Sequence, residues 1–222
     1  MNTKQSILTA TIVSLLVSGP IQAGWKAQSQ GGSDAQIQVV EQLSDAEEAN
    51  LLFMREEEKL ARDVYRTLSK QWSQPVFYNI STSEQRHMDS LAVLLNRYAL
   101  LDPVIDDSVG VFVNPELAAL YTALTTEGAE SLIAALIVGA KIEEIDILDL
   151  QRAIAESTHP DLIQVYENLM RGSRNHLRAF VRQIEGLGVA YESQMMEQSD
   201  VDMILDSPME RGRNSLKGRR GR

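Results

Sequence analysis

The chain has 222 residues, of which 44% are hydrophobic and only 5% aromatic, with six prolines and no cysteine. This length supports one sizeable core, and the scarcity of aromatic residues favours helices over a sandwich of short strands. The net charge of −10 argues against nucleic acid as a main partner, and the lack of cysteine excludes a disulfide framework and a thiolate metal site.

Residues 1–23 have the pattern of a secretory signal peptide. Lys4 supplies a positive charge, residues 7–17 are apolar, and residues 19–23 include small residues suited to cleavage. The apolar run is short for a membrane span. The sequence therefore predicts an exported chain, periplasmic or secreted, with no stable membrane insertion after cleavage. A retained N-terminal anchor is the alternative.

A flexible lead-in rich in Gln, Ser and Gly is expected over residues 24–43. A capping box at Ser44 and Glu47 then begins the first helix, which ends near Trp72. The same spacing at Ser81 and Glu84 predicts the start of the second helix. The chain between these two helices is expected to run back as an extended strap.

The second half of the chain predicts two more long helices. A connection of roughly 25 residues contains one short helix, which starts at Asn114 and Pro115 as a cap followed by proline. Long helices are expected over residues 129–157 and 160–186. Residues 189–222 are first acidic and Met-rich and then basic, and we expect them to be disordered.

The pattern of helices predicts an all-α fold over residues 44–188. Two helix pairs joined by a long crossover between helices two and three are the arrangement of a ferritin-like four-helix bundle. In such bundles a metal site takes one Glu from each of two helices and a Glu-x-x-His motif from each of the other two.

The first two helices offer three ligand residues for such a site. Glu84 and His87 have the Glu-x-x-His spacing on the apolar face of the second helix. On the first helix, the apolar residues lie within about 60° of Glu57 on a helical wheel. Glu57 is therefore the first choice for the inward carboxylate, and Glu58 is the second.

The third and fourth helices offer a less complete set. Glu143 lies nearest the centre of the apolar face of the third helix, with Glu144 and Asp146 as alternatives. His176 takes the histidine position of a Glu-x-x-His motif on the fourth helix, but Ser173 stands in place of the carboxylate. This half of the site would be open to water at Ser173.

Carboxylates and imidazoles without thiolates suit Fe or Mn, and we expect one or two ions. An open coordination position would suit metal-dependent oxidation or peroxide scavenging in the cell envelope. The alternative is a metal-free helical binding or structural module, in which the same side chains form a buried hydrogen-bonded network. The expected partners are metal ions and not nucleic acid, and a homodimer is left open.

Several separated segments resemble one known family. Residues 53–65, 77–91, 143–150 and 172–180 together resemble the ferritin-like domain of unknown function 2202. The resemblance covers residues 51–187 and implies a ferritin-like fold, whose larger relatives often bind two iron or manganese ions. Ser173 departs from the di-iron pattern at the second metal position.

Overall fold

The computed structural model describes residues 42–212, and within them it contains six α-helices and no strand. The helices are α1 (Asp45–Trp72), α2 (Pro75–Arg97), α3 (Pro115–Gly128), α4 (Leu132–Glu156), α5 (Pro160–Gly186) and α6 (Gln198–Asp206). The all-α prediction is confirmed for this part of the chain. The predicted signal peptide lies outside the described residues, as does all of the predicted lead-in except its last two residues.

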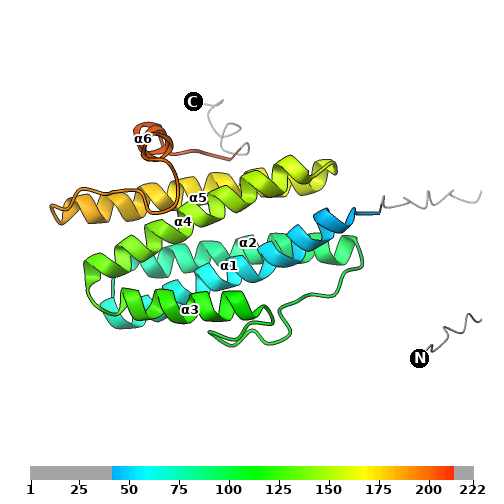
Figure 1. Ribbon diagram of the computed structural model, residues 1–222, viewed down its shortest axis with the longest axis horizontal. Helices are drawn as coiled ribbons and strands as arrows, with labels where there is room; N and C mark the ends of the chain where they lie inside the picture. Colours follow the sequence, from blue (N-terminus) through cyan, green and yellow to red (C-terminus); the bar gives the residue numbers. More distant parts are fainter. Residues whose placement is uncertain (1–41, 213–222) are drawn as a thin grey trace, which may run out of the picture. The chain divides into compact units, whose positions relative to one another are not determined.

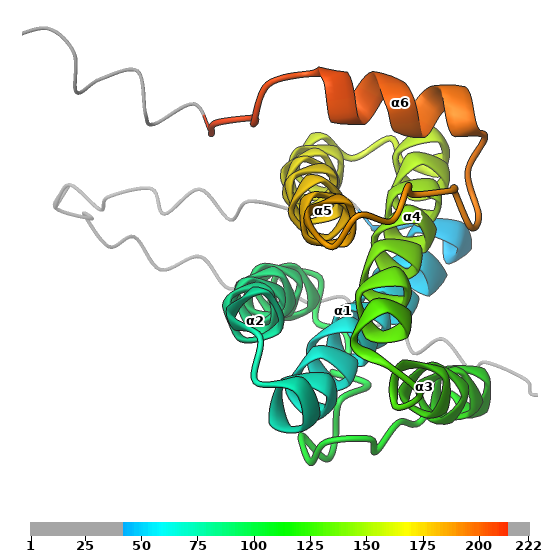
Figure 2. The ribbon, with the colours of Figure 1, turned by 90° about the vertical axis from the view of Figure 1, so that its left-hand side faces the viewer.

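Two helical hairpins form the body of the described chain. α1 packs most extensively against α2, and α4 against α5. The hairpins lie against each other through α1 with α4 and α2 with α5 (Figure 1). α3 fills the crossover between the hairpins beside α1 and α4, whereas α6 crosses over the second hairpin (Figure 2). None of these described helices is long and apolar enough to span a membrane.

The first hairpin turns more tightly than the sequence suggested. Ser73 ends α1 in the left-handed conformation, with φ of 52°, and Pro75 takes the first position of α2. The predicted strap and the predicted helix start at Ser81 are therefore wrong. Ser81 instead lies inside α2, where its Oγ donates to the Tyr78 carbonyl at 2.9 Å.

This early start of α2 decides where its polar residues lie. Glu84 is about 14 Å along α2 from Pro75, and Glu58 is about 21 Å along α1 from Trp72. Because α2 begins at Pro75 and runs back along α1, Glu84 and His87 lie beside the middle of α1. There His87 Nδ1 is 3.2 Å from Glu58 Oε2.

The apolar core consists of two clusters, one toward each end of the bundle. One cluster contains Tyr65, Phe77 and Phe180, and the other contains Leu51, Leu91 and Tyr166. In each of the four long helices, buried apolar residues lie on both sides of the buried acids or histidines. The polar residues of the bundle thus lie between two apolar layers that limit their contact with water.

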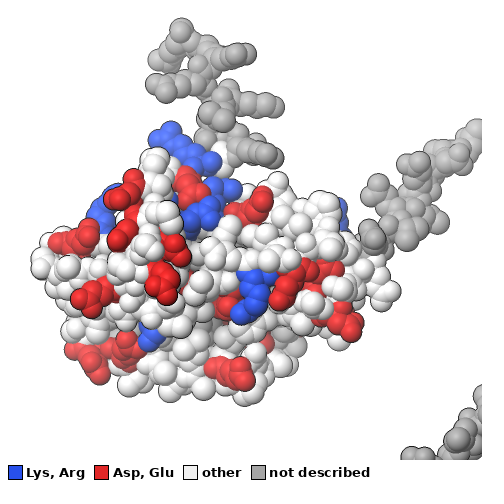
Figure 3. All heavy atoms as spheres, turned by 45° about the horizontal axis from the view of Figure 1, so that its top comes forward, with Lys and Arg blue, Asp and Glu red and all other residues white. Residues whose placement is uncertain are grey.

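The predicted disorder of the C-terminal segment is wrong for residues 189–212. α6 buries Val201 completely, and the Ile204 carbonyl accepts a hydrogen bond from Arg178 Nε at 2.8 Å. The burial of Val201 and hydrogen bonds with α4 and α5 therefore hold a segment whose composition suggested disorder. On the face shown in Figure 3, acidic side chains are scattered widely, and a basic group lies near the end of the described chain.

Candidate metal centre

Buried titratable side chains from all four long helices meet in the middle of the bundle. The carboxylates are at most 2% exposed, and the two imidazoles are 12% and 11% exposed. The residues are Glu58 of α1, Glu84 and His87 of α2, Glu143 of α4 and His176 of α5.

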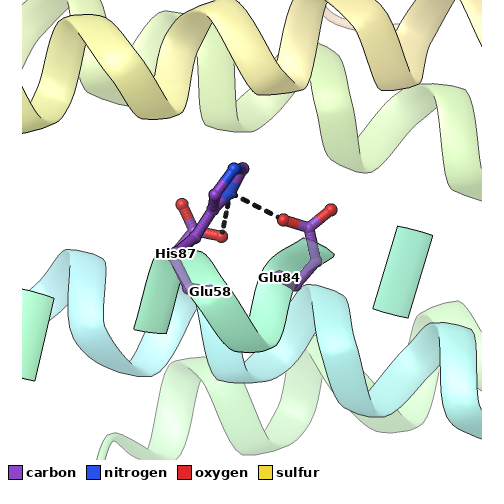
Figure 4. A group of neighbouring side chains, drawn as sticks. All are labelled: Glu58, Glu84 and His87. Carbon is purple, nitrogen blue, oxygen red and sulfur yellow. Dashed lines mark hydrogen bonds and ion pairs between the residues drawn. The ribbon is translucent and has the colours of Figure 1, made fainter. Parts of the chain in front are cut away.

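The first group consists of Glu58, Glu84 and His87. His87 Nδ1 lies 2.8 Å from Glu84 Oε2 and 3.2 Å from Glu58 Oε2. Figure 4 shows the three side chains rising from α1 and α2, with both carboxylates directed to the same edge of the imidazole. One ligand atom from each residue lies within 4.8 Å of the others, a spacing that one metal ion can span.

The second group repeats this arrangement across the hairpin interface. His176 Nδ1 lies 2.9 Å from Glu84 Oε1 and 3.4 Å from Glu143 Oε2. These ligand atoms also lie within 4.8 Å of one another. Glu84 therefore belongs to both groups, and its two oxygens face different histidines.

Two further contacts orient the second group. Tyr65 Oη donates to Glu143 Oε1 at 2.6 Å, and it also lies 3.2 Å from the Gly139 carbonyl. His176 Nε2 lies 3.0 Å from Ser83 Oγ, so the ring nitrogen remote from the carboxylates also has a polar partner. Such contacts hold ligand side chains in a fixed orientation.

Ser173 is paired with a carboxylate from the neighbouring helix. Its Oγ donates to Asp146 Oδ2, and both residues are buried. Asp146 comes from α4, one turn after Glu143, and the negative charges of Glu58 and Glu143 act on it. Where the Glu-x-x-His motif lacks its Glu, a buried pair of Ser173 and Asp146 is found, and the predicted opening to water at Ser173 is not.

Several atoms of this cluster lack a hydrogen-bond partner among the described residues. They are Glu58 Oε1, Glu84 Oε1, Asp146 Oδ1 and His176 Nδ1. Glu84 Oε1 and His176 Nδ1 approach to 2.9 Å without forming a well-oriented hydrogen bond. Buried polar atoms without partners are costly, and a metal cation would satisfy oxygen and nitrogen lone pairs together. The donor set therefore fits a metal.

The charges in the cluster shift the pKa values of its members. Burial lowers the pKa of His176, but Glu84 and Glu143 outweigh it and raise that pKa to about 10. Burial opposes a charged His87 as well, yet Glu58 and Glu84 hold its pKa well above the usual value.

The carboxylates respond in opposite directions. Burial raises the pKa of Glu58 to about 7, although His87 acts in the opposite sense. Burial would also raise the pKa of Glu84, but the two histidines lower it below the usual value. Burial and like charges raise the pKa of Asp146 well above its usual range. Without a metal, bound protons thus balance the excess of negative charge.

The structure brings together four of the five first-choice residues, namely Glu84, His87, Glu143 and His176. Glu57 does not join either group. It faces α4, where burial and, after it, the negative charges of Asp146 and Asp149 raise its pKa. The second choice, Glu58, takes its place.

Among the alternatives on α4, Glu144 is directed away from this cluster. It accepts hydrogen bonds from Tyr191 Oη at 2.6 Å and from the Met195 and Met196 amides at 2.6 and 2.8 Å. Glu144 therefore anchors the segment before α6. Asp146, in contrast, lies beside the cluster through Ser173.

Tyr65 and Ser83 are partners of the ligand residues that the sequence did not predict. Tyr65 lies two helical turns after Glu58, a spacing that keeps both on one face of α1. Ser83 directly precedes Glu84, and sequence pattern alone carries no signal for its contact with α5.

A family model described as "Uncharacterized protein domain (DUF2202)" matches residues 47–208. The chain belongs to the DUF2202 family. The resemblance to this family is thereby confirmed, and the DUF2202 match includes all members of both ligand groups together with α6.

The chain is also similar to a curated relative and to a solved structure. The uncharacterized protein MJ0754 of Methanocaldococcus jannaschii is 48% identical over 172 residues, which are 78% of this chain and 93% of that protein. The crystal structure of hypothetical protein MJ0754 from Methanococcus jannaschii matches with a TM-score of 0.76 and 47% identity. That match covers 77% of this chain and 98% of the solved one.

Proposed function

We propose that this DUF2202 protein is a ferritin-like four-helix-bundle protein that binds two divalent ions, Fe or Mn, in its core. The observation that carries the proposal is the sharing of Glu84 between two carboxylate–histidine groups. Because its two oxygens face two separate imidazoles, Glu84 would help to hold a cation in each group. The long crossover between α2 and α4 supports the ferritin-like assignment.

The donor set decides the class of metal. Each position would have two carboxylates and one imidazole, which suit Fe or Mn better than ions that prefer thiolates. Glu58, Glu84 and His87 would hold one ion, and Glu84, Glu143 and His176 the other. Three protein ligands leave room at each ion for water or another small ligand.

A bound Fe or Mn would supply redox chemistry toward dioxygen or peroxide. The chain's own part is to orient and shield the reacting centre. Tyr65 holds Glu143, Ser83 holds His176, and the apolar layers at both ends restrict water. This arrangement favours oxidation of a small substrate or removal of peroxide. The predicted signal peptide would place that activity in the cell envelope.

Metal content tests the proposal directly. The mature chain, expressed without a tag, is reconstituted with Fe(II) without oxygen or with Mn(II), desalted, and measured by elemental analysis. About two ions per chain are expected. Fewer than about 0.2 ion per chain would refute metal binding at this site.

The metal-free module remains the competing function because the same side chains already contact one another. Thermal unfolding of His87→Ala separates the two. If metal binds, the variant loses more stability in the presence of Mn(II) than in its absence. An equal loss in both conditions would favour the metal-free network.

A further inference from the structure

Gly172 lies in the interior of α5, opposite the imidazole of His87. A Cβ atom at this position would lie 2.6 Å from His87 Nε2 and 2.7 Å from His87 Cε1. The next nearest atom, His176 Cε1, would be 3.9 Å away, which is ordinary contact. The glycine therefore leaves the space that the His87 ring occupies.

Glycine is unfavourable inside a helix, so its presence there calls for a reason. A comparison within α5 shows that the reason is local. At Gly186, the last residue of the helix, an added Cβ would meet no atom within 4 Å. Only the first of these two glycines is required for a close approach between helices.

The position of the His87 ring is determined from both sides. On one edge Nδ1 faces Glu84 and Glu58, and on the other edge Nε2 and Cε1 lie against the α5 backbone at Gly172. A side chain at 172 would push the ring along α2 or toward the carboxylates. Either movement changes the distances of 2.8 and 3.2 Å on which the first ligand group depends.

We propose that Gly172 is a positioning residue for His87, and through it for the metal position formed by Glu58, Glu84 and His87. This inference rests on the proposed function. α5 would thus help to orient a ligand of a metal position whose three ligands all come from α1 and α2. The second position takes its imidazole from His176, which has room for the added carbon.

Gly172→Ala and the control Gly186→Ala are compared with the wild-type chain by metal content after reconstitution with Mn(II). The wild type and Gly186→Ala are expected to keep about two ions per chain, and Gly172→Ala about one. Two tightly bound ions in Gly172→Ala would overturn the inference while leaving the proposed function intact. No metal in the wild type would refute the proposed function instead.

A double-mutant cycle tests the positioning without any metal, so it remains decisive in either case. In metal-free protein, Gly172→Ala is expected to lower the melting temperature when His87 is present. In a His87→Ala background, the same change is expected to raise it, because the overlap is gone and alanine favours the helix. The same effect in both backgrounds would show that Gly172 does not act through His87.

Discussion

The imidazole rings of His87 and His176 are stacked, with centroids 5.6 Å apart and planes inclined by 25°. The two residues come from different hairpins, yet both turn Nδ1 toward Glu84, one to each of its oxygens. The shared Glu84 and the stacked rings therefore join the two ligand groups into one centre. That centre forms only where the two hairpins meet.

Neighbouring acids on α1 should differ in their effect on metal binding. We expect Glu58→Gln to lose one of the two ions, because Glu58 belongs to the first ligand group. Glu57→Gln is the matched control and should retain both, because Glu57 faces Asp146 and Asp149 instead. Elemental analysis after desalting measures the difference. Loss of metal in the Glu57 variant alone would contradict the assignment of the groups.

Metal binding should strengthen as pH rises. The pKa values of His176 and Glu58, about 10 and about 7, mean that the metal-free centre carries protons near neutral pH. A metal must displace these protons, so binding releases them and becomes tighter at higher pH. Calorimetric titration in two buffers with different heats of ionisation counts the protons. An affinity that is constant between about pH 6 and 8 would contradict this account.

Tyr65→Phe should weaken the second metal position without unfolding the protein. The change removes the 2.6 Å hydrogen bond to Glu143, and the loss of such outer partners typically lowers metal affinity about 10- to 100-fold. Competition with a chelator measures the affinity. Tyr166→Phe is the control, because that buried hydroxyl has no hydrogen-bond partner among the described residues and lies in the other apolar cluster. Equal affinities in all three proteins would exclude this role for Tyr65.

Glu47 should contribute strongly to stability and nothing to metal binding. It forms the capping box with Ser44 and also accepts hydrogen bonds from the amides of Thr158 and His159 and from His159 Nδ1. Glu47→Ala should therefore cost about 2–3 kcal/mol in urea unfolding. Glu48→Ala, at an exposed position in the same turn, should cost much less.

The pH dependence of that loss has a definite sign. Although burial acts in the opposite direction, the hydrogen bonds from His159, Thr158 and Ser44 lower the pKa of Glu47 below its ordinary 4.5. Its stabilisation is therefore fully present above the ordinary pKa and is lost as pH falls through the lowered value. A difference between wild type and Glu47→Ala that grows on acidification would contradict this.

The helices and most of the centre could be predicted because they depend on local signals. The capping box at Ser44 and the proline start of α3 both appear where the sequence suggested them. Glu84 and His87 fall on one face simply because they are three residues apart. The start of α2 was predicted wrongly because its N-cap residue, Gln74, forms no side-chain hydrogen bond, whereas Ser81 and Glu84 have the spacing of a capping box.

The choice between Glu57 and Glu58 could not be made from a helical wheel. The wheel assumes one solvent face, but α1 packs against α2, α3 and α4, so that residues 54–65 are all buried. Because this part of α1 has no exposed polar face, the centre of its apolar residues on a helical wheel does not show which carboxylate faces α2. The pairing of Asp146 with Ser173 likewise depends on how α4 and α5 pack, which sequence spacing does not encode.

Anomalous X-ray scattering from crystals loaded with Mn(II) or Fe(II) would locate metal ions bound between the four long helices. Two peaks are expected, one beside His87 Nδ1 and one beside His176 Nδ1, with Glu84 between them. A loaded crystal with no anomalous peak in the bundle core, or with peaks only at surface carboxylates, would contradict this expectation.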